Sequence, residues 1–165
     1  MIGLGVGALG FVWPGIIGGG DPITAGVLAG GQPVTLVTVM FVVRFGLSAI
    51  SYAAATPGGL FAPLLVLGAQ LGFLFGAACH SAFPGLDVPG TSFALVGMAA
   101  LFAGAVRSPL TGLVLVSEMT GNVTLLLPAL EACAFAMLVP TLVRNAPIYD
   151  TLRETLLRRA RGAAR

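Results

Sequence analysis

The feature that most constrains this chain is a series of apolar segments interrupted by glycine and proline. Only the segments at 34–55 and 60–83 reach the roughly 20 residues that a helix needs to cross a bilayer. The other apolar segments are shorter or contain proline, and they lie at 1–13, 93–106, 109–118 and 125–143. Charged residues make up only 8% of the chain, against about 25% in a soluble domain. We therefore expect an integral membrane protein.

Short, broken apolar segments have two interpretations. They can be ordinary membrane spans with indistinct ends, or partial and tilted helices whose ends meet inside the membrane, as in many transporters. Irregular backbone at membrane depth occurs only where protein buries it or where it lines a wet cavity. Because the interruptions recur along the chain, we favour the second interpretation and expect an all-α polytopic membrane protein with short, tilted and broken helices.

The residue types argue against an enzyme. All eight basic residues are arginine, so no lysine can form a Schiff base or bind a phosphate in a P-loop, and His80 is the single histidine. Cys79 and Cys133 are far apart and form no CxxC motif, so we expect each to be a small packing residue rather than a metal ligand or half of a disulfide. The glycines between Gly5 and Gly10 match GxGxxG, but no strand precedes them and no acid follows at the required distance. We expect no cofactor and no metal site.

The positive charges gather at one end of the chain. Six of the eight arginines lie within 144–165, and the positive-inside rule predicts that this end is cytoplasmic. We therefore expect a membrane-embedded helical bundle over 1–147, followed by a terminal helix and basic tail over 148–165. The arginines of that helix suit a solvated face, and we expect no nucleic-acid partner.

The stretch TPGGLFAP, residues 56–63, predicts the start of a helix. Pro57 and the glycines end the preceding helix, and a new helix follows from Leu60 with Pro63 in its first turn. The first N–H groups of a helix have no intrahelical partner and carry the equivalent of about half a positive charge. Facing a pocket, they form an anion site without any basic side chain. A plain turn capped by water remains the alternative.

Other residues suggest packing or polar roles. Gly68, Gly72 and Gly76 form a small-residue face that lets two helices approach closely, and Gly26 and Gly30 form a second such pair. Small residues at this spacing predict tight packing within the subunit.

Polar groups inside apolar segments need partners. Arg44 should face the bundle, and Glu131 should face either a polar cavity or a subunit interface. Tyr149, near the start of the terminal helix, offers a neutral hydroxyl donor for an anion. A tyrosine of the interfacial aromatic belt is the alternative interpretation of Tyr149.

Four stretches resemble the CLC family of chloride channels and chloride–proton antiporters. They are GGGDPITAG, GGLFAP with the glycine-rich helix after it, GMAALFAGAVRSPLTGLVLVSEMTGN and APIYDTL. They occur in the family's order and cover nearly the whole chain. The resemblance implies the second of the two inverted halves of a CLC-type subunit, which passes chloride or another small anion through a pore lined by helix N-termini.

The resemblance also implies roles for single residues. Leu60 and Phe61 match positions whose backbone amides contact the central anion, and Gly58 and Gly59 form the turn before them. Tyr149 matches the tyrosine whose hydroxyl contacts the same anion.

Three further residues match the family in structural positions. Arg107 and Pro109 belong to the Arg-x-Pro-Leu-Thr-Gly turn, and Glu118 belongs to the Glu-Met-Thr helix end. We expect Arg107 to reach the lipid headgroups or to bond exposed carbonyls. We expect Glu118 to satisfy nearby helix-end donors.

The family's first-half motifs, Gly-Ser-Gly-Ile-Pro and Gly-Arg-Glu-Gly-Pro, do not occur here. We therefore expect the C-terminal portion of a membrane domain that needs its N-terminal half as a partner and forms a homodimer in the complete protein. We do not expect this portion to conduct chloride by itself. The choice between channel and antiporter stays open. The alternative is a non-conducting structural or regulatory membrane protein that pairs with a separately encoded first half.

Overall fold

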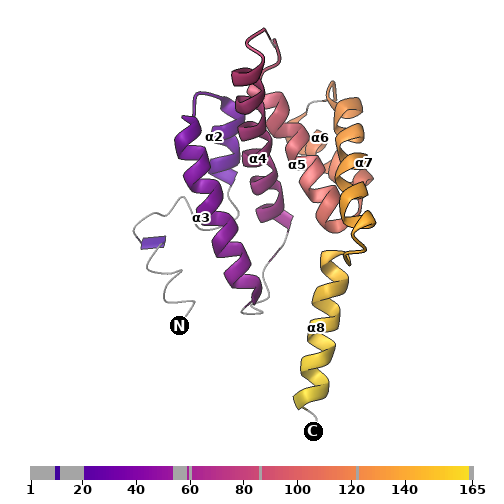
Figure 1. Ribbon diagram of the computed structural model, residues 1–165. Coiled ribbons are helices and arrows are strands. Elements are labelled where there is room, and N and C mark those ends of the chain that lie inside the picture. Colours follow the sequence, from indigo (N-terminus) through magenta and orange to yellow (C-terminus); the bar gives the residue numbers. More distant parts are fainter. Residues whose placement is uncertain are drawn as a thin grey trace.

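The computed structural model describes residues 10–11, 21–53, 59, 61–85, 87–121 and 123–163. All regular structure in these ranges is helical (Figure 1). The helices are α2 (Asp21–Ala29), α3 (Val34–Ala53), α4 (Phe61–Ala82), α5 (Gly90–Val106), α6 (Pro109–Thr120), α7 (Leu126–Leu142) and α8 (Ile148–Ala163). The expected all-α fold is confirmed.

The helices differ in how far they could reach across a bilayer. Helices α3 and α4, with 20 and 22 residues, are long and apolar enough to cross one. Helices α5 and α7 have 17 residues each and α6 has 12, so these three are short for a full crossing. The mixture of long and short apolar helices agrees with the sequence-based expectation.

Helix α4 occupies the middle of the bundle, with α2 and α3 on one side and α5, α6 and α7 on the other (Figure 1). Its glycine face packs against α5 with almost no space between the backbones. A Cβ atom on Gly68 would lie 2.6 Å from the carbonyl oxygen of Gly97, and one on Gly76 would lie 2.8 Å from the Phe93 ring. We call this contact, formed by Gly68, Gly72, Gly76, Phe93 and Gly97, the α4–α5 seam.

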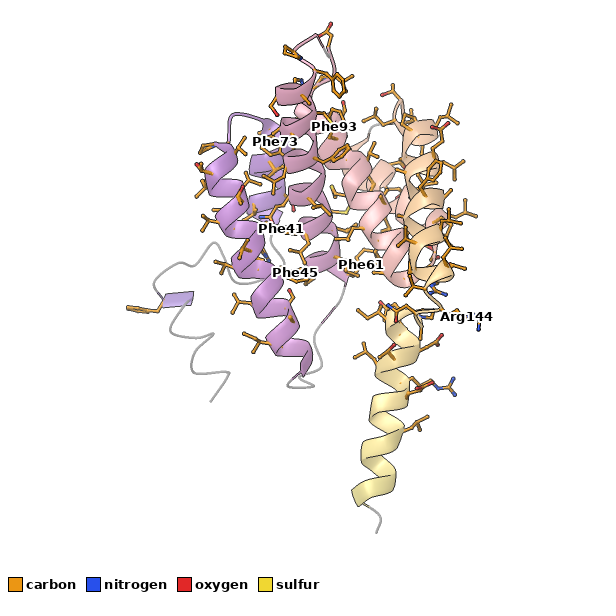
Figure 2. The ribbon with its side chains drawn as sticks, in the orientation of Figure 1. Phe41, Phe45, Phe61, Phe73, Phe93 and Arg144 are labelled. Atoms are coloured by element: carbon orange, nitrogen blue, oxygen red, sulfur yellow. The ribbon has the colours of Figure 1, made fainter. Side chains whose placement is uncertain are left out.

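The core extends from the seam into the other helices. Val27 on α2, Met98 and Phe102 on α5, and Cys133 on α7 are at most 2% exposed. Arg44 on α3 is only 6% exposed, so it faces the bundle as expected. Many large apolar side chains instead cover the outside of the bundle (Figure 2). Phe75, Leu110 and Phe135, for example, are each more than 60% exposed. Such an apolar exterior suits lipid or a partner protein.

The expectation for Gly26 and Gly30 is wrong. Helix α2 ends at Ala29, and Gly30 has a φ of +77° with no atom within 4 Å of an added Cβ. An added Cβ on Gly26 would meet the Gln32 side chain rather than another helix. Gly30 therefore supplies the left-handed residue that ends the helix, which glycine adopts without a steric cost.

Candidate functional site

The predicted anion site surrounds the start of α4. Phe61 is the first residue of that helix, and Gly59, two residues before it, is exposed. Gly58 and Leu60 lie outside the described residues. Pro63 falls in the first turn, where the N–H that proline lacks would have no intrahelical partner anyway. The local sequence therefore begins a helix at Phe61, next to the predicted start at Leu60, and the anion-binding role of its first amides stays a prediction.

Packing holds the first residue of α4 in position. The ring of Phe61 lies 5.0 Å, centroid to centroid, from the ring of Phe102 on α5, and the planes meet at 69°. This edge-to-face arrangement is a favourable one for aromatic pairs. Because Phe102 is only 2% exposed, it anchors the start of α4 to the core.

A hollow of about 220 Å³ lies between the start of α4 and the start of α8. We call it the α4–α8 hollow. Ile148, the first residue of α8, lines it together with residues of α3 and α4: Phe45, Ser48, Ala49, Pro63, Leu64 and Leu67. Tyr149 follows Ile148 directly and is 50% exposed. The exposed surface of the hollow is apolar, so electrostatic interactions there are weakened less than in bulk water.

Helix α7 ends in a tight, hydrogen-bonded turn before α8 begins. The N–H of Arg144 donates to the Thr141 carbonyl at 3.1 Å, and the N–H of Asn145 donates to the Pro140 carbonyl at 3.0 Å. Arg144 is left-handed, with a φ of 54°. This pattern is a Schellman motif with arginine where glycine is usual. Figure 2 shows Arg144 at the junction between the two helices.

Arg107 connects this junction to the end of α5. Its backbone is left-handed, with a φ of 60°, and its N–H donates to the Ala103 carbonyl at 2.8 Å. Its Nη2 donates to the Pro140 carbonyl at 3.1 Å and also to the Asn145 carbonyl. Of the two roles expected for Arg107, the structure shows the bonding of exposed carbonyls.

The remaining residues named from the sequence lie away from the α4–α8 hollow. Pro109 is the first residue of α6. Glu118 is exposed on the last turn of α6, and no hydrogen bond of its carboxylate is seen in the described part of the chain, so its predicted contact with helix-end donors stays a prediction. Glu131 is exposed on α7. No group of three possible metal ligands occurs among the residues described.

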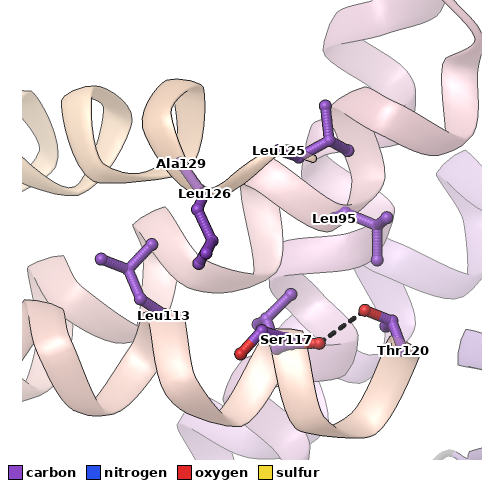
Figure 3. Close-up of a pocket in the computed structure, with 8 residues that line it drawn as sticks. Leu95, Leu113, Ser117, Thr120, Leu125, Leu126 and Ala129 are labelled. Carbon is purple, nitrogen blue, oxygen red and sulfur yellow. Dashed lines mark hydrogen bonds between the residues drawn. The ribbon is translucent and has the colours of Figure 1, made fainter. Parts of the chain in front are cut away.

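Two other hollows lack polar groups that could bind an anion. The small one between α5, α6 and α7 measures about 10 Å³ (Figure 3). Its hydroxyls donate within their own helix, Ser117 to the Val114 carbonyl at 2.8 Å and Thr120 to the Val116 carbonyl at 2.6 Å. A larger groove of about 730 Å³ between α4, α5 and α7 is lined entirely by apolar residues. The exposed surface of the α4–α8 hollow is also apolar, but this hollow lies beside the first turns of two helices, α4 and α8. It is the better candidate because helix N-termini can bind an anion.

Comparison with known proteins places these features in a family. A family model described as voltage gated chloride channel matches residues 1–141. The H(+)/Cl(-) exchange transporter ClcA of Klebsiella pneumoniae subsp. pneumoniae is 39% identical over 157 residues, covering 95% of this chain and 33% of ClcA. ClcA of Vibrio parahaemolyticus is 37% identical over 145 residues, covering 88% of this chain and 31% of its own length.

A solved structure agrees with the sequence relatives. The crystal structure of a slow cyanobacterial Cl-/H+ antiporter superposes with a TM-score of 0.71 at 33% sequence identity. The match covers 79% of this chain and 31% of the antiporter chain. This chain thus spans about a third of the length of the proteins that it matches.

Proposed function

This chain belongs to the voltage-gated chloride channel family, and we propose that it forms part of a transporter that exchanges chloride for protons across a membrane. The observation that carries the proposal is the apolar hollow where the start of α4 meets the start of α8. The curated relatives are named as H(+)/Cl(-) exchange transporters, and the structural neighbour is a Cl-/H+ antiporter. These names favour exchange over passive conduction.

In this proposal the anion is held by neutral donors. The backbone amides of the Gly58–Phe61 turn, with Gly59 and Leu60 inside it, face the ion, and the Tyr149 hydroxyl donates a hydrogen bond to it. The apolar lining strengthens the attraction between the helix end and the anion, since little water screens it. No formal cation is needed, which suits an ion that must bind and leave quickly.

We further propose how the chain sits in the membrane and with its partners. Residues 1–147 lie in the bilayer, and residues 148–165 form a terminal helix with a basic cytoplasmic tail, in agreement with the positive-inside rule. Helix α8 projects away from the bundle, as such an arrangement requires (Figure 1). Sequence corresponding to the rest of the relatives' length supplies the other pore wall, and two copies pair as a homodimer through exposed apolar side chains.

Removal of the Tyr149 hydroxyl tests the proposed site. The protein in its native length is purified, its chloride affinity is measured by calorimetry, and its chloride efflux is measured from liposomes. We expect Tyr149→Phe to weaken chloride binding about tenfold, because one hydrogen bond to a charged group is lost. Ser81→Ala removes a hydroxyl at the far end of α4 and is the matched control, expected to bind as the unaltered protein does.

The outcomes separate the proposals. Unchanged affinity and efflux in Tyr149→Phe would remove Tyr149 from the site. A well-folded native-length protein that neither binds nor moves chloride would support the non-conducting alternative instead.

A further inference from the structure

We propose that Arg107 is a positioning residue that sets the orientation of Tyr149 by holding the α7–α8 junction. This inference rests on the proposed role of Tyr149 in chloride binding. Arg107 lies at the end of α5, 33 residues from Pro140 and 38 residues from Asn145, the two residues whose carbonyls it binds. We call this pair of hydrogen bonds the Arg107 clamp.

The Arg107 clamp can form only with the closed form of the turn that ends α7. Pro140 and Asn145 are already joined to each other, because the Asn145 N–H donates to the Pro140 carbonyl at 3.0 Å. One guanidinium nitrogen, Nη2, donates to the carbonyls of both residues. Both acceptors lie within reach of the same nitrogen only when the turn is closed, so the clamp stabilises that closed turn.

The closed turn determines where α8 begins. The Pro147 carbonyl accepts hydrogen bonds from the N–H groups of Asp150 and Thr151, each at 3.1 Å, and these bonds start the helix. Between the clamp at Asn145 and this first turn lie only Ala146 and Pro147, and the proline ring fixes one backbone dihedral. A change in the direction of the Asn145 carbonyl therefore turns the whole first turn of α8, including Tyr149.

The position of Ile148 at the α4–α8 hollow cannot by itself fix the orientation of the first turn of α8. Ile148 lines an apolar hollow together with residues of α3 and α4. Apolar packing is not directional, so it holds α8 near the hollow but leaves its rotation free. The clamp supplies directional hydrogen bonds on the other side of the junction. In the proposal, the two contacts together fix how the first turn of α8, which contains Tyr149, is oriented relative to the start of α4.

Arginine is suited to this role and lysine is not. A guanidinium group is planar and presents its N–H donors in a fixed arrangement, whereas an ammonium group is a compact point charge on a flexible stem. Arg107→Lys therefore keeps the positive charge near the site while it loosens the geometry. This substitution separates a positioning role from simple attraction of the anion by charge.

The test uses the native-length protein with four variants: Arg107→Lys, Arg107→Gln, Tyr149→Phe and the double variant Arg107→Lys/Tyr149→Phe. Chloride affinity is measured by calorimetry. We expect Arg107→Lys and Arg107→Gln each to weaken binding about fivefold to tenfold, as residues that act through one network do. In the Tyr149→Phe background, Arg107→Lys should add less than about a twofold loss. Arg153→Gln removes an exposed arginine of α8 and should bind chloride normally.

A second readout reports on position directly. Hydrogen–deuterium exchange of the amides in the first turn of α8 should become faster in Arg107→Lys and Arg107→Gln, while exchange in the α4–α5 seam stays unchanged. A purely electrostatic role for Arg107 would leave the exchange of Arg107→Lys as it is in the unaltered protein.

Three results would overturn the proposal. If Arg107→Lys binds chloride as tightly as the unaltered protein, the positive charge of Arg107 matters and its geometry does not. Losses that multiply in the double variant would show that Arg107 acts independently of Tyr149. Failure of both Arg107 variants to fold, while Tyr149→Phe folds, would make Arg107 a determinant of the fold instead. If Tyr149→Phe itself binds chloride normally, the failure belongs to the proposed site rather than to the clamp.

Discussion

The α4–α5 seam and the α7–α8 junction hold helices together by opposite means. In the seam, two backbones touch because Gly68, Gly72 and Gly97 have no side chains to keep them apart. At the junction, the contact depends on Arg107, one of the largest side chains, whose guanidinium group reaches carbonyls on another helix end. The seam is non-directional packing, and the junction is directional hydrogen bonding.

The difference suggests a division of tasks within the bundle. Close packing between small residues has one best distance and resists any added volume, which makes the seam a rigid support for the start of α4. Hydrogen bonds to a helix end can open and close without disturbing a core, which makes the junction adjustable. The anion site that we propose lies between the two, with its amides on α4 and its hydroxyl on α8.

The largest effect is expected from adding one methyl group to the seam. In Gly72→Ala the new Cβ would lie 2.9 Å from the Phe93 carbonyl carbon and 3.0 Å from the Gly97 Cα, and nearer still to the Phe93 carbonyl oxygen. Backbone atoms cannot move aside cheaply, so we expect a loss of about 3 kcal/mol of stability. Thermal unfolding in detergent, followed by size-exclusion chromatography, measures it.

A glycine outside the seam provides the matched control. Gly46 on α3 has no atom within 4 Å of an added Cβ. Gly46→Ala should therefore stabilise the protein by about 0.5–1 kcal/mol, since alanine favours a helix more than glycine does. Equal effects of the two substitutions would show that the seam is not close-packed and would remove the contrast with the junction.

A smaller effect of opposite sign is expected on the other face of α4. Gln70 lies about 200° around the helix from Gly68 and from Gly72, given about 100° per residue. It is fully buried, and neither its Oε1 nor its Nε2 has a hydrogen-bond partner within the described structure. Gln70→Leu removes this unsatisfied amide at similar volume, so we expect about 1–2 kcal/mol of added stability in thermal unfolding.

Gln32, in the turn between α2 and α3, is the control for that substitution because it is only partly buried. Gln32→Leu should change stability little. A marked loss of stability in Gln70→Leu would show that the buried amide is bonded in the membrane-embedded protein, and this face of α4 would then resemble the junction rather than the seam.

The sequence predicted the two regions unequally. The repeat of Gly68, Gly72 and Gly76 is visible because its spacing matches one face of a helix, and the proline–glycine pattern before Phe61 likewise marks a helix start. Gly97 on the facing helix was missed, because it is flanked by Val96 and Met98 and has no glycine four residues before or after it. Local patterns predict which face of a helix packs but not which residue of another helix meets it.

The junction was harder to predict for a related reason. The sequence left two roles open for Arg107, and only the folded chain shows that α7 ends within its reach. The hollow that Ile148 lines together with Pro63 and Leu64 likewise joins segments that no local pattern relates. Contacts between distant segments depend on how the helices are arranged, which the sequence of each helix does not specify by itself.

The smallest effect is expected at the turn that the clamp holds. Arg144 has a φ of 54°, a conformation that glycine adopts more readily than any residue with a Cβ. We expect Arg144→Gly to raise stability by about 0.5–1 kcal/mol, partly offset by the greater freedom of glycine in the unfolded chain. Arg144→Ala removes the same charge but keeps the Cβ, so it should bring no gain. The Arg107 clamp should change the size of this gain. Because the clamp helps to hold the left-handed turn closed, Arg144→Gly should stabilise the protein more in the Arg107→Lys background than in the unaltered protein. An equal gain in both backgrounds, or a similar gain from Arg144→Ala, would show that the turn closes without the help of Arg107.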